Sequence, residues 1–370
     1  MEEEVKCHSM IKNSFSLLGY FSKHIQVRSY SMKINEVVSC LNNLAPTSLA
    51  ESWDNVGLLV EPYTKRDIKK MLLTNDLTEA VMDEADNLNV DFILSYHPPL
   101  FRPIKRITCK AWKERIAARC LEKGIAIYSP HTSYDALKGG VNDWLIEAFG
   151  EGTVSPIQAS TASPPFSHKV TVAAADEAEA LELRDKFAGH LGKSQNVTRT
   201  NGSCVEILCN ENSLPAIVSV DGATTKPLTI SKLENVPIVG HGMGRKCELL
   251  RPMTITEAIG RIKAHLGLPY VRLALAHGAK LGSKIQSVAV CAGSGSSVLR
   301  GVKADLWLTG EMSHHEVLDA THQRSSVVLT DHSNCERGYL QTLQPRLQDL
   351  FDQKIEVIVS SKDRDPLEVV

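Results

Sequence analysis

Short apolar segments alternate with amphipathic ones along most of the chain. Apolar residues between Ile34 and Ala45 recur with the 3.6-residue period of a helix, and residues 70–74 form an apolar stretch that predicts a buried strand ending at Asn75 and Asp76. The pattern continues with expected helices at 78–87, 109–122 and 141–149 and expected strands at 91–96 and 125–129. Strands that alternate with helices are typical of an α/β protein, so we expect a layered α/β/α core.

The composition changes at residues 160–166, where Ser, Thr, Ala and Pro are typical of a linker. Beyond it, strands are expected at 168–173 and 203–209 and helices at 177–191 and 213–220. The core pattern then resumes, with a helix at 256–266 and strands at 285–291, 304–308 and 326–330. The sequence therefore predicts a small inserted α+β domain at 160–232 between two parts of the core, 33–159 and 233–370.

Residues 1–32 precede the first expected helix and have a composition of their own. No acid occurs between Val5 and Asn35, whereas basic residues are spread among serines and apolar residues, which is typical of a mitochondrial transit peptide. Three glutamates at positions 2–4 argue against that interpretation and favour a flexible tail. We expect a cytoplasmic protein, with the nucleus as an alternative, and a mitochondrial one if the tail is a targeting signal.

Composition and charge indicate which classes of binding partner to expect. Apolar residues make up 43% of the chain and charged residues 23%, as in a folded globular protein. A formal net charge of -2 gives no basic footprint for a phosphate backbone, so direct nucleic-acid binding is not expected. The nine cysteines form no C-x-x-C pair, which favours reduced thiols. No apolar stretch approaches the roughly 20 residues of a membrane helix, so no membrane partner is expected.

Metal-ligand residue types follow three of the expected strands. His97 comes after the strand at 91–96, His131 after 125–129 with Asp135 four residues on, and His332 after 326–330 with Glu336 four residues on. The carboxyl ends of the strands in an open α/β sheet face one crevice, so these side chains should converge. Imidazole and carboxylate ligands suit Zn, Mn or Fe(II), and the leading hypothesis is metal-assisted hydrolysis.

Each of these pairs also has a simpler interpretation. If a helix begins near Asp331 or Ser333, His332 and Glu336 share one face and can hold an ion, but they can equally be a surface histidine and a solvated acid. Asp135 can be a ligand with His131 as its neighbour, or it can face water or cap the next helix. Three such sites at one sheet edge favour the metal.

Two further motifs lie at strand ends. His314 and His315 are adjacent, so at most one of them can face the crevice, where it would contact a ligand residue or the substrate. The glycine-rich stretch 293–297 can either hold an anion on its backbone N–H groups or form a tight turn, and the turn is favoured because the dinucleotide spacing and the phosphate-binding lysine are missing.

Taken together, the motifs resemble those of the NIF-three-like family, also known as GTP cyclohydrolase I type 2 homologues. The resemblance covers about 34–159 and 236–370 and rests on the segments 53–58, 95–101, 129–136, 242–245, 309–315 and 331–336. It implies an α/β fold with a dinuclear metal site and ring-like homo-oligomers. By motif matching it implies metal ligands at His97, Asp135, His332 and Glu336, with Glu336 bridging two ions.

One departure concerns the number of ions. Many family members have a His-His pair where this chain has Tyr96 and His97, and a neutral phenol with a pKa near 10 is a poor ligand. We therefore expect one or two divalent ions per chain (Zn, Mn or Fe), with the second position in question.

Two functions remain as hypotheses. The first is a metal-dependent hydrolase in which His131 or His315 moves protons, acting on a nucleotide, as the family name implies, or on a phosphate ester. The second is a non-enzymatic homo-oligomer that regulates transcription through protein partners, as the resemblance allows. Loss of a ligand at Tyr96 favours the second hypothesis, and retention of the other ligand types favours the first.

Overall fold

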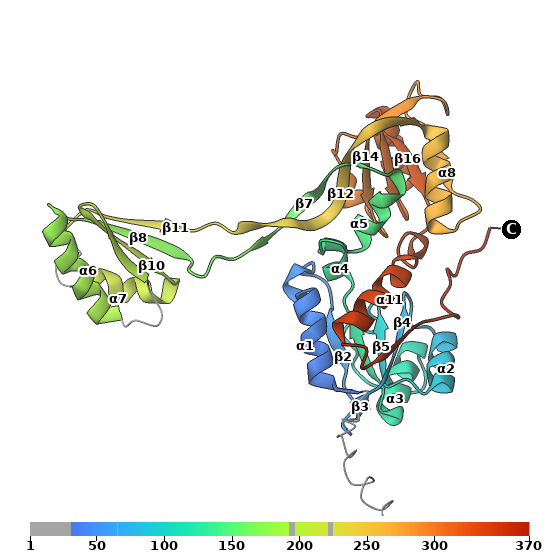
Figure 1. Cartoon of the computed structure of the whole chain (residues 1–370), viewed down its shortest axis with the longest axis horizontal. Helices are drawn as coiled ribbons and strands as arrows, with labels where there is room; N and C mark the ends of the chain where they lie inside the picture. The colour runs from blue at the N-terminus through green and yellow to red at the C-terminus, as the bar shows by residue number, and fades with distance from the viewer. Residues whose placement is uncertain (1–30, 65, 192–196, 221–224, 370) are drawn as a thin grey trace, which may run out of the picture.

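A computed structural model describes residues 31–64, 66–191, 197–220 and 225–369. Figure 1 shows a two-part core and a third body that projects from it on two long strands. Of the predicted tail, 1–32, only residues 31 and 32 lie in the described chain, where Met32 belongs to β1 (Met32–Lys33), the partner of β3 (Asp67–Ile68). None of the described helices is long and apolar enough to cross a membrane.

The first core sheet has five strands in the order β17-β4-β5-β6-β2, all parallel except β2. Its strands are β2 (Gly57–Val60), β4 (Lys70–Thr74), β5 (Phe92–Ser95), β6 (Ala126–Ser129) and β17 (Glu356–Val359). Its helices are α1 (Ile34–Leu44), α2 (Glu79–Leu88), α3 (Trp112–Lys123) and α11 (Tyr339–Leu350). Because successive strand side chains point to opposite faces, α1 and α11 share one hydrophobic core with the sheet while α2 and α3 share another.

The second core sheet has six strands in the order β13-β16-β15-β14-β12-β7, of which β14, β15 and β16 are parallel. Its strands are β7 (Gly152–Ala162), β12 (Val236–Thr254), β13 (Arg272–Ala274), β14 (Lys284–Cys291), β15 (Leu306–Thr309) and β16 (Ser326–Leu329). Its helices are α5 (Val141–Ile146) and α8 (Ile255–Leu266) on one face and α9 (Ser296–Leu299) and α10 (His314–His322) on the other. The predicted layered α/β/α core is therefore confirmed.

The inserted domain is an antiparallel sheet in the order β11-β8-β10-β9, with two helices and a hydrophobic core of its own. Its elements are β8 (His168–Ala173), α6 (Glu177–Leu191), β9 (Val197–Asn201), β10 (Cys204–Cys209), α7 (Leu214–Val218) and β11 (Leu228–Lys232). This is the split βαβ arrangement of ferredoxin-like domains. Sequence reasoning missed β9 because its Val-Thr-Arg-Thr-Asn sequence has no apolar alternation.

The linker predicted at 160–166 is partly a strand. β7 continues to Ala162 and pairs with β12 on the way out of the core, because the long β12 supplies hydrogen bonds to residues whose composition alone is typical of a loop. The two strands form the ribbon that carries the inserted domain (Figure 1).

Candidate metal centre

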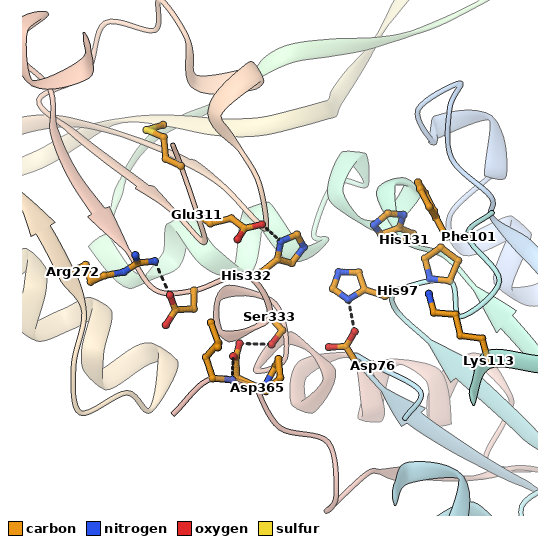
Figure 2. A pocket seen from close by; sticks show the side chains of 15 residues that line it. Asp76, His97, Phe101, Lys113, His131, Arg272, Glu311, His332, Ser333 and Asp365 are labelled. Atoms are coloured by element: carbon orange, nitrogen blue, oxygen red, sulfur yellow. Dashed lines mark hydrogen bonds and ion pairs between the residues drawn. The ribbon is translucent and has the colours of Figure 1, made fainter. Parts of the chain in front are cut away.

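A cavity of about 760 Å³ lies where the carboxyl ends of the two core sheets meet. His97 and His131 reach it from the first sheet, and His332 reaches it from the second. Figure 2 shows these three imidazoles facing one another across the pocket. The ring centroid of His97 lies 5.3 Å from that of His131 and 5.1 Å from that of His332. The strand-end histidines therefore converge as predicted, but from two sheets rather than at the edge of one, because β16 belongs to the six-stranded sheet.

Three side chains form a group that can hold a metal ion. Ligand atoms of His97, His332 and Glu336 all lie within 4.8 Å of one another. Glu336 stands between the two imidazoles, because its carboxylate oxygens lie 3.2 Å from Nε2 of His97 and 3.7 Å from Nε2 of His332. The helix expected near Asp331 or Ser333 is instead a single 3₁₀ turn, Ser333–Cys335, yet it places His332 and Glu336 on the same side.

The surroundings of these atoms fit a divalent cation. Nε2 of His97 is buried and faces the Glu336 carboxylate at 3.2 Å without the geometry of a hydrogen bond. Gly293, at φ +61°, borders the same space: a Cβ there would lie 2.7 Å from Oε1 of Glu336 and 3.1 Å from Nε2 of His332. Two imidazole nitrogens and one carboxylate are ligands that suit Zn, Mn and Fe(II). A buried ring nitrogen that faces a carboxylate is well placed to share a metal ion with it.

A carboxylate holds the other ring nitrogen of each pocket histidine. Nδ1 of His97 lies 2.9 Å from Asp76, Nδ1 of His332 lies 2.7 Å from Glu311, and Nδ1 of His131 lies 2.7 Å from Asp54. Such pairs fix the orientation of the ring and leave Nε2 free for a metal or a proton. Sequence reasoning gave no role to the three acids, although Asp76 and Glu311 also follow strand ends.

The charges of His97 and Glu336 depend on one another. Burial lowers the pKa of His97, but Glu336 and Asp76 outweigh it and hold that pKa well above its ordinary value. Burial raises the pKa of Glu336, but His97 and His332 outweigh it and lower that pKa. Without a metal the pair is an imidazolium beside a carboxylate, and a divalent cation would replace the proton.

Asp135 lies outside the group of three. It is buried in α4 (Thr132–Ala136), and its Oδ1 accepts a hydrogen bond from the hydroxyl of Tyr96. Burial raises the pKa of Asp135 to about 6, partly offset by His131 and Tyr96. Burial, together with Asp135, raises the pKa of Tyr96 well above its ordinary value, so the phenol stays neutral. Of the four predicted ligands, the structure joins three and pairs the fourth with Tyr96.

The two predicted proton carriers lie in different environments. His131 borders the pocket at φ 34°, a conformation that costs energy for a residue with a side chain and is often found at functional sites. His315 is exposed on α10 and does not line the pocket, and its ring lies 5.5 Å from that of His314. The same strand end does reach the pocket, but through Glu311.

The glycine-rich stretch 293–297 is a tight turn. The N–H of Gly295 donates to the hydroxyl of Thr309 at 3.0 Å, and the N–H of Gly293 donates to Sγ of Cys335 at 3.1 Å. These N–H groups are therefore satisfied within the protein, and α9 has only four residues. The turn brings Gly293 against the metal group rather than holding an anion.

Comparison with known proteins agrees with the resemblance. A family model described as Duf34/NIF3 (NGG1p interacting factor 3) matches residues 32–366. "NIF3-like protein 1" from Rattus norvegicus is 46% identical over 353 residues, covering 92% of this chain and 93% of the relative. "NGG1-interacting factor 3" from Saccharomyces cerevisiae is 31% identical over 350 residues, covering 91% and 97%.

The fold also matches a solved structure. The Bacillus cereus protein related to NIF3 superposes with a TM-score of 0.66 at 25% identity, covering 91% of this chain and 99% of that one. Sequence and fold lead to the same conclusion: this chain belongs to the Duf34/NIF3 family.

Proposed function

We propose that the protein is a divalent-metal-dependent hydrolase in which His97, His332 and Glu336 hold the ion. The observation that carries the proposal is the buried Nε2 of His97, which faces the buried Glu336 carboxylate at 3.2 Å in an open pocket of about 760 Å³. A structural site would be closed by its ligands, whereas a pocket of this size leaves room for water and substrate. A bound ion supplies a Lewis acid that polarises substrate and water.

His131 supplies the proton chemistry in this proposal. Asp54 holds its Nδ1, and the side chain of Asp54 is itself fully buried and hydrogen-bonded to Thr132, so the ring is fixed while Nε2 stays available. A water attacks the electrophilic phosphorus or carbon, its proton passes to Nε2 of His131, and the bond to the leaving group breaks. His131→Ala should then lower kcat by about 100-fold or more with the bound metal unchanged.

Tyr96 fixes the number of ions at one in this proposal. Its phenol occupies the Asp135 carboxylate, which would otherwise be free to ligate a second ion. Tyr96→His replaces the phenol by an imidazole and should raise the metal content from one ion to two per chain. Tyr96→Phe frees Asp135 without adding a ligand and so separates the two effects, and one ion per chain in both variants would contradict the assignment.

The decisive experiment is elemental mass spectrometry of the purified protein after reconstitution with Zn, Mn or Fe(II). Wild type should retain one ion after dialysis, and His332→Ala and Glu336→Ala should fall to background while Glu248→Ala, an exposed acid on β12, should not. Hydrolysis of bis(p-nitrophenyl) phosphate should follow the metal content. Metal that persists in both site variants would overturn the proposal.

A second candidate is a protein that acts through partners. The yeast relative and the family model both bear the name of an interacting factor, which supports a protein-binding role for this chain as well. Metal that is held but supports no hydrolysis of any ester would favour this candidate. Light scattering after size-exclusion chromatography would test the homo-oligomer that the family resemblance implies.

A further inference from the structure

A strongly basic segment adjoins the metal pocket. Residues 101–113, which run from the loop after β5 into the first turn of α3, contain five cations and no acid, although the whole chain has a formal net charge of -2. The five are Arg102, Lys105, Arg106, Lys110 and Lys113. All five are exposed, and no ion pair in the described parts of the chain involves any of them. The nearest acid in the sequence, Glu114, accepts hydrogen bonds from Thr108, so mutual repulsion among the five cations favours an anion from outside the chain.

The segment also exposes apolar side chains between its cations. Ile107 is 48% exposed and Trp112 is 43% exposed, and the ammonium of Lys113 lies 5.3 Å from the Trp112 ring. At its start, Phe101 lies 6.0 Å from Trp53, which is itself 59% exposed. Three aromatic side chains in or beside the segment are therefore partly exposed to solvent. A ligand that carries both anionic groups and planar rings would match this surface.

Both ends of the segment reach the pocket. Phe101 and Lys113 line the cavity, and the Phe101 ring lies 6.4 Å from the ring of His131. Figure 2 shows Lys113 and Phe101 on the same side of the pocket as His97 and His131. Four acids line the pocket, and each has a partner in the protein: Asp76 and Glu311 pair with histidines, Asp331 pairs with Arg272, and Asp365 accepts a hydrogen bond from Ser333. A chain bound along the segment thus has an end beside the metal group.

We propose that residues 101–113 bind single-stranded nucleic acid, with phosphates on the cations, bases stacked on Trp53, Phe101 and Trp112, and one end in the metal pocket. Basic grooves lined with aromatic rings bind single strands in this way, because every base offers a face for stacking. An acidic peptide supplies the charge but no regular series of planar rings. The proposal names the substrate class of the proposed hydrolase and rests on it for any cleavage, whereas binding itself needs no metal.

The test is fluorescence anisotropy of a labelled twelve-residue oligothymidylate, titrated with the full chain at several salt concentrations. Each cation that binds a phosphate of a single strand adds about 0.7 to the slope with which the logarithm of the affinity falls against the logarithm of the salt concentration. Lys105→Gln, Arg106→Gln and Lys110→Gln together should therefore lower this slope by about 2. The matched control removes three exposed cations near the amino ends of β14 and β15, Lys280→Gln, Lys284→Gln and Lys303→Gln, and should leave the slope unchanged. Equal slopes in the two triple variants would overturn the proposal.

Two further measurements separate the alternatives. Trp112→Ala should weaken binding about tenfold if bases stack there, whereas an unchanged affinity would contradict stacking.

Binding to vesicles with 30% phosphatidylserine that disappears in the basic triple variant, with no binding to the oligonucleotide, would overturn the proposal in favour of a membrane surface. If the oligonucleotide fails to bind while bis(p-nitrophenyl) phosphate is still hydrolysed, the substrate class is wrong and the hydrolase stands.

Discussion

The two core sheets contribute to the metal group in different ways. His97 follows the parallel strand β5, and its side chain is 20% exposed, whereas His332 follows the residue Asp331 at φ 68° and its side chain is 40% exposed. Glu336, only 3% exposed, joins them. The first sheet supplies a fixed and buried ligand, and the second supplies a more open one. An open ligand is the one that solvent and substrate can approach.

The second-sheet loop is nevertheless tied to the first sheet. The amide of Asn75, at the end of β4, donates to Oε2 of Glu336 at 3.2 Å. The hydroxyl of Ser333 donates to Asp365 at 2.7 Å, in the segment that follows β17 of the first sheet. The chain therefore closes the first sheet with its last strand and holds the loop of the second sheet as it does so. The geometry of the metal group therefore depends on how the two sheets are positioned relative to one another.

The sharpest way to break this junction is to fill the space between the sheets. Gly293→Ala adds a Cβ 2.7 Å from Oε1 of Glu336 at a backbone conformation that favours glycine. We expect loss of the bound metal, with a decrease of only about 1 kcal/mol in the free energy of unfolding. Elemental mass spectrometry measures the bound metal, and chemical denaturation measures the free energy of unfolding.

Gly278→Ala is the matched control for that substitution. Gly278 has φ +82° and open space around the added Cβ, so this variant carries the same backbone cost without the collision. It should keep its metal and show a similar decrease in the free energy of unfolding. If Gly293→Ala also keeps its metal, the ion does not lie between Glu336 and His332.

A smaller effect should show which of the two sheets contributes more to metal affinity. Asp76→Asn and Glu311→Gln each remove the charge that orients one ligand histidine, and such changes lower metal affinity by about 10- to 100-fold. Asp76 acts on the buried His97, whereas Glu311 has a half-exposed side chain on the open His332. We expect the larger loss for Asp76→Asn in competition with a fluorescent chelator. The reverse order would show that the second sheet holds the ion more firmly.

Much of this arrangement could be predicted from the sequence, because strand ends are local signals. The apolar stretches before His97, His131 and His332 are short and clearly bounded, and the rule that strand ends of one sheet share a crevice brings His97 and His131 together. The approach of His332 from a second sheet could not be predicted in this way, since it depends on how the two sheets pack. The pairing of Asp135 with Tyr96 could not be predicted, since it depends on how α4 packs behind β5. The role of Glu311 instead of His315 also depends on packing, here on the direction in which the turn after β15 leaves the sheet.

The net charge of the whole chain does not reveal the basic segment at residues 101–113. A formal net charge of -2 argues against nucleic acid only if charge is spread evenly, and residues 101–113 have five cations and no acid. Whether those cations stay free depends on their neighbours in space, which the sequence does not give. The ferredoxin-like order of the inserted domain was missed because neither edge strand, β9 or β11, was predicted, and β9 has hydrogen bonds but no apolar pattern.

The smallest expected effect concerns protons. The pKa of His97 is raised in the metal-free protein, so its ring carries a proton at pH 7, whereas the lowered pKa of Glu336 leaves that carboxylate charged. Binding of a divalent ion to Nε2 must therefore release about one proton, and metal affinity should fall about tenfold for each pH unit below the raised pKa of His97. Affinity should rise with pH and level off above that pKa.

Calorimetry in two buffers of different ionisation enthalpy measures the released proton at pH 7. In Asp76→Asn one of the two acids that raise the pKa of His97 is neutral, so the pKa falls toward its ordinary value and fewer protons should be released. Glu311→Gln should release as many as wild type, because Glu311 contacts His332 and not His97. Equal proton release by the two variants would contradict the assignment of the exchangeable proton to the first sheet.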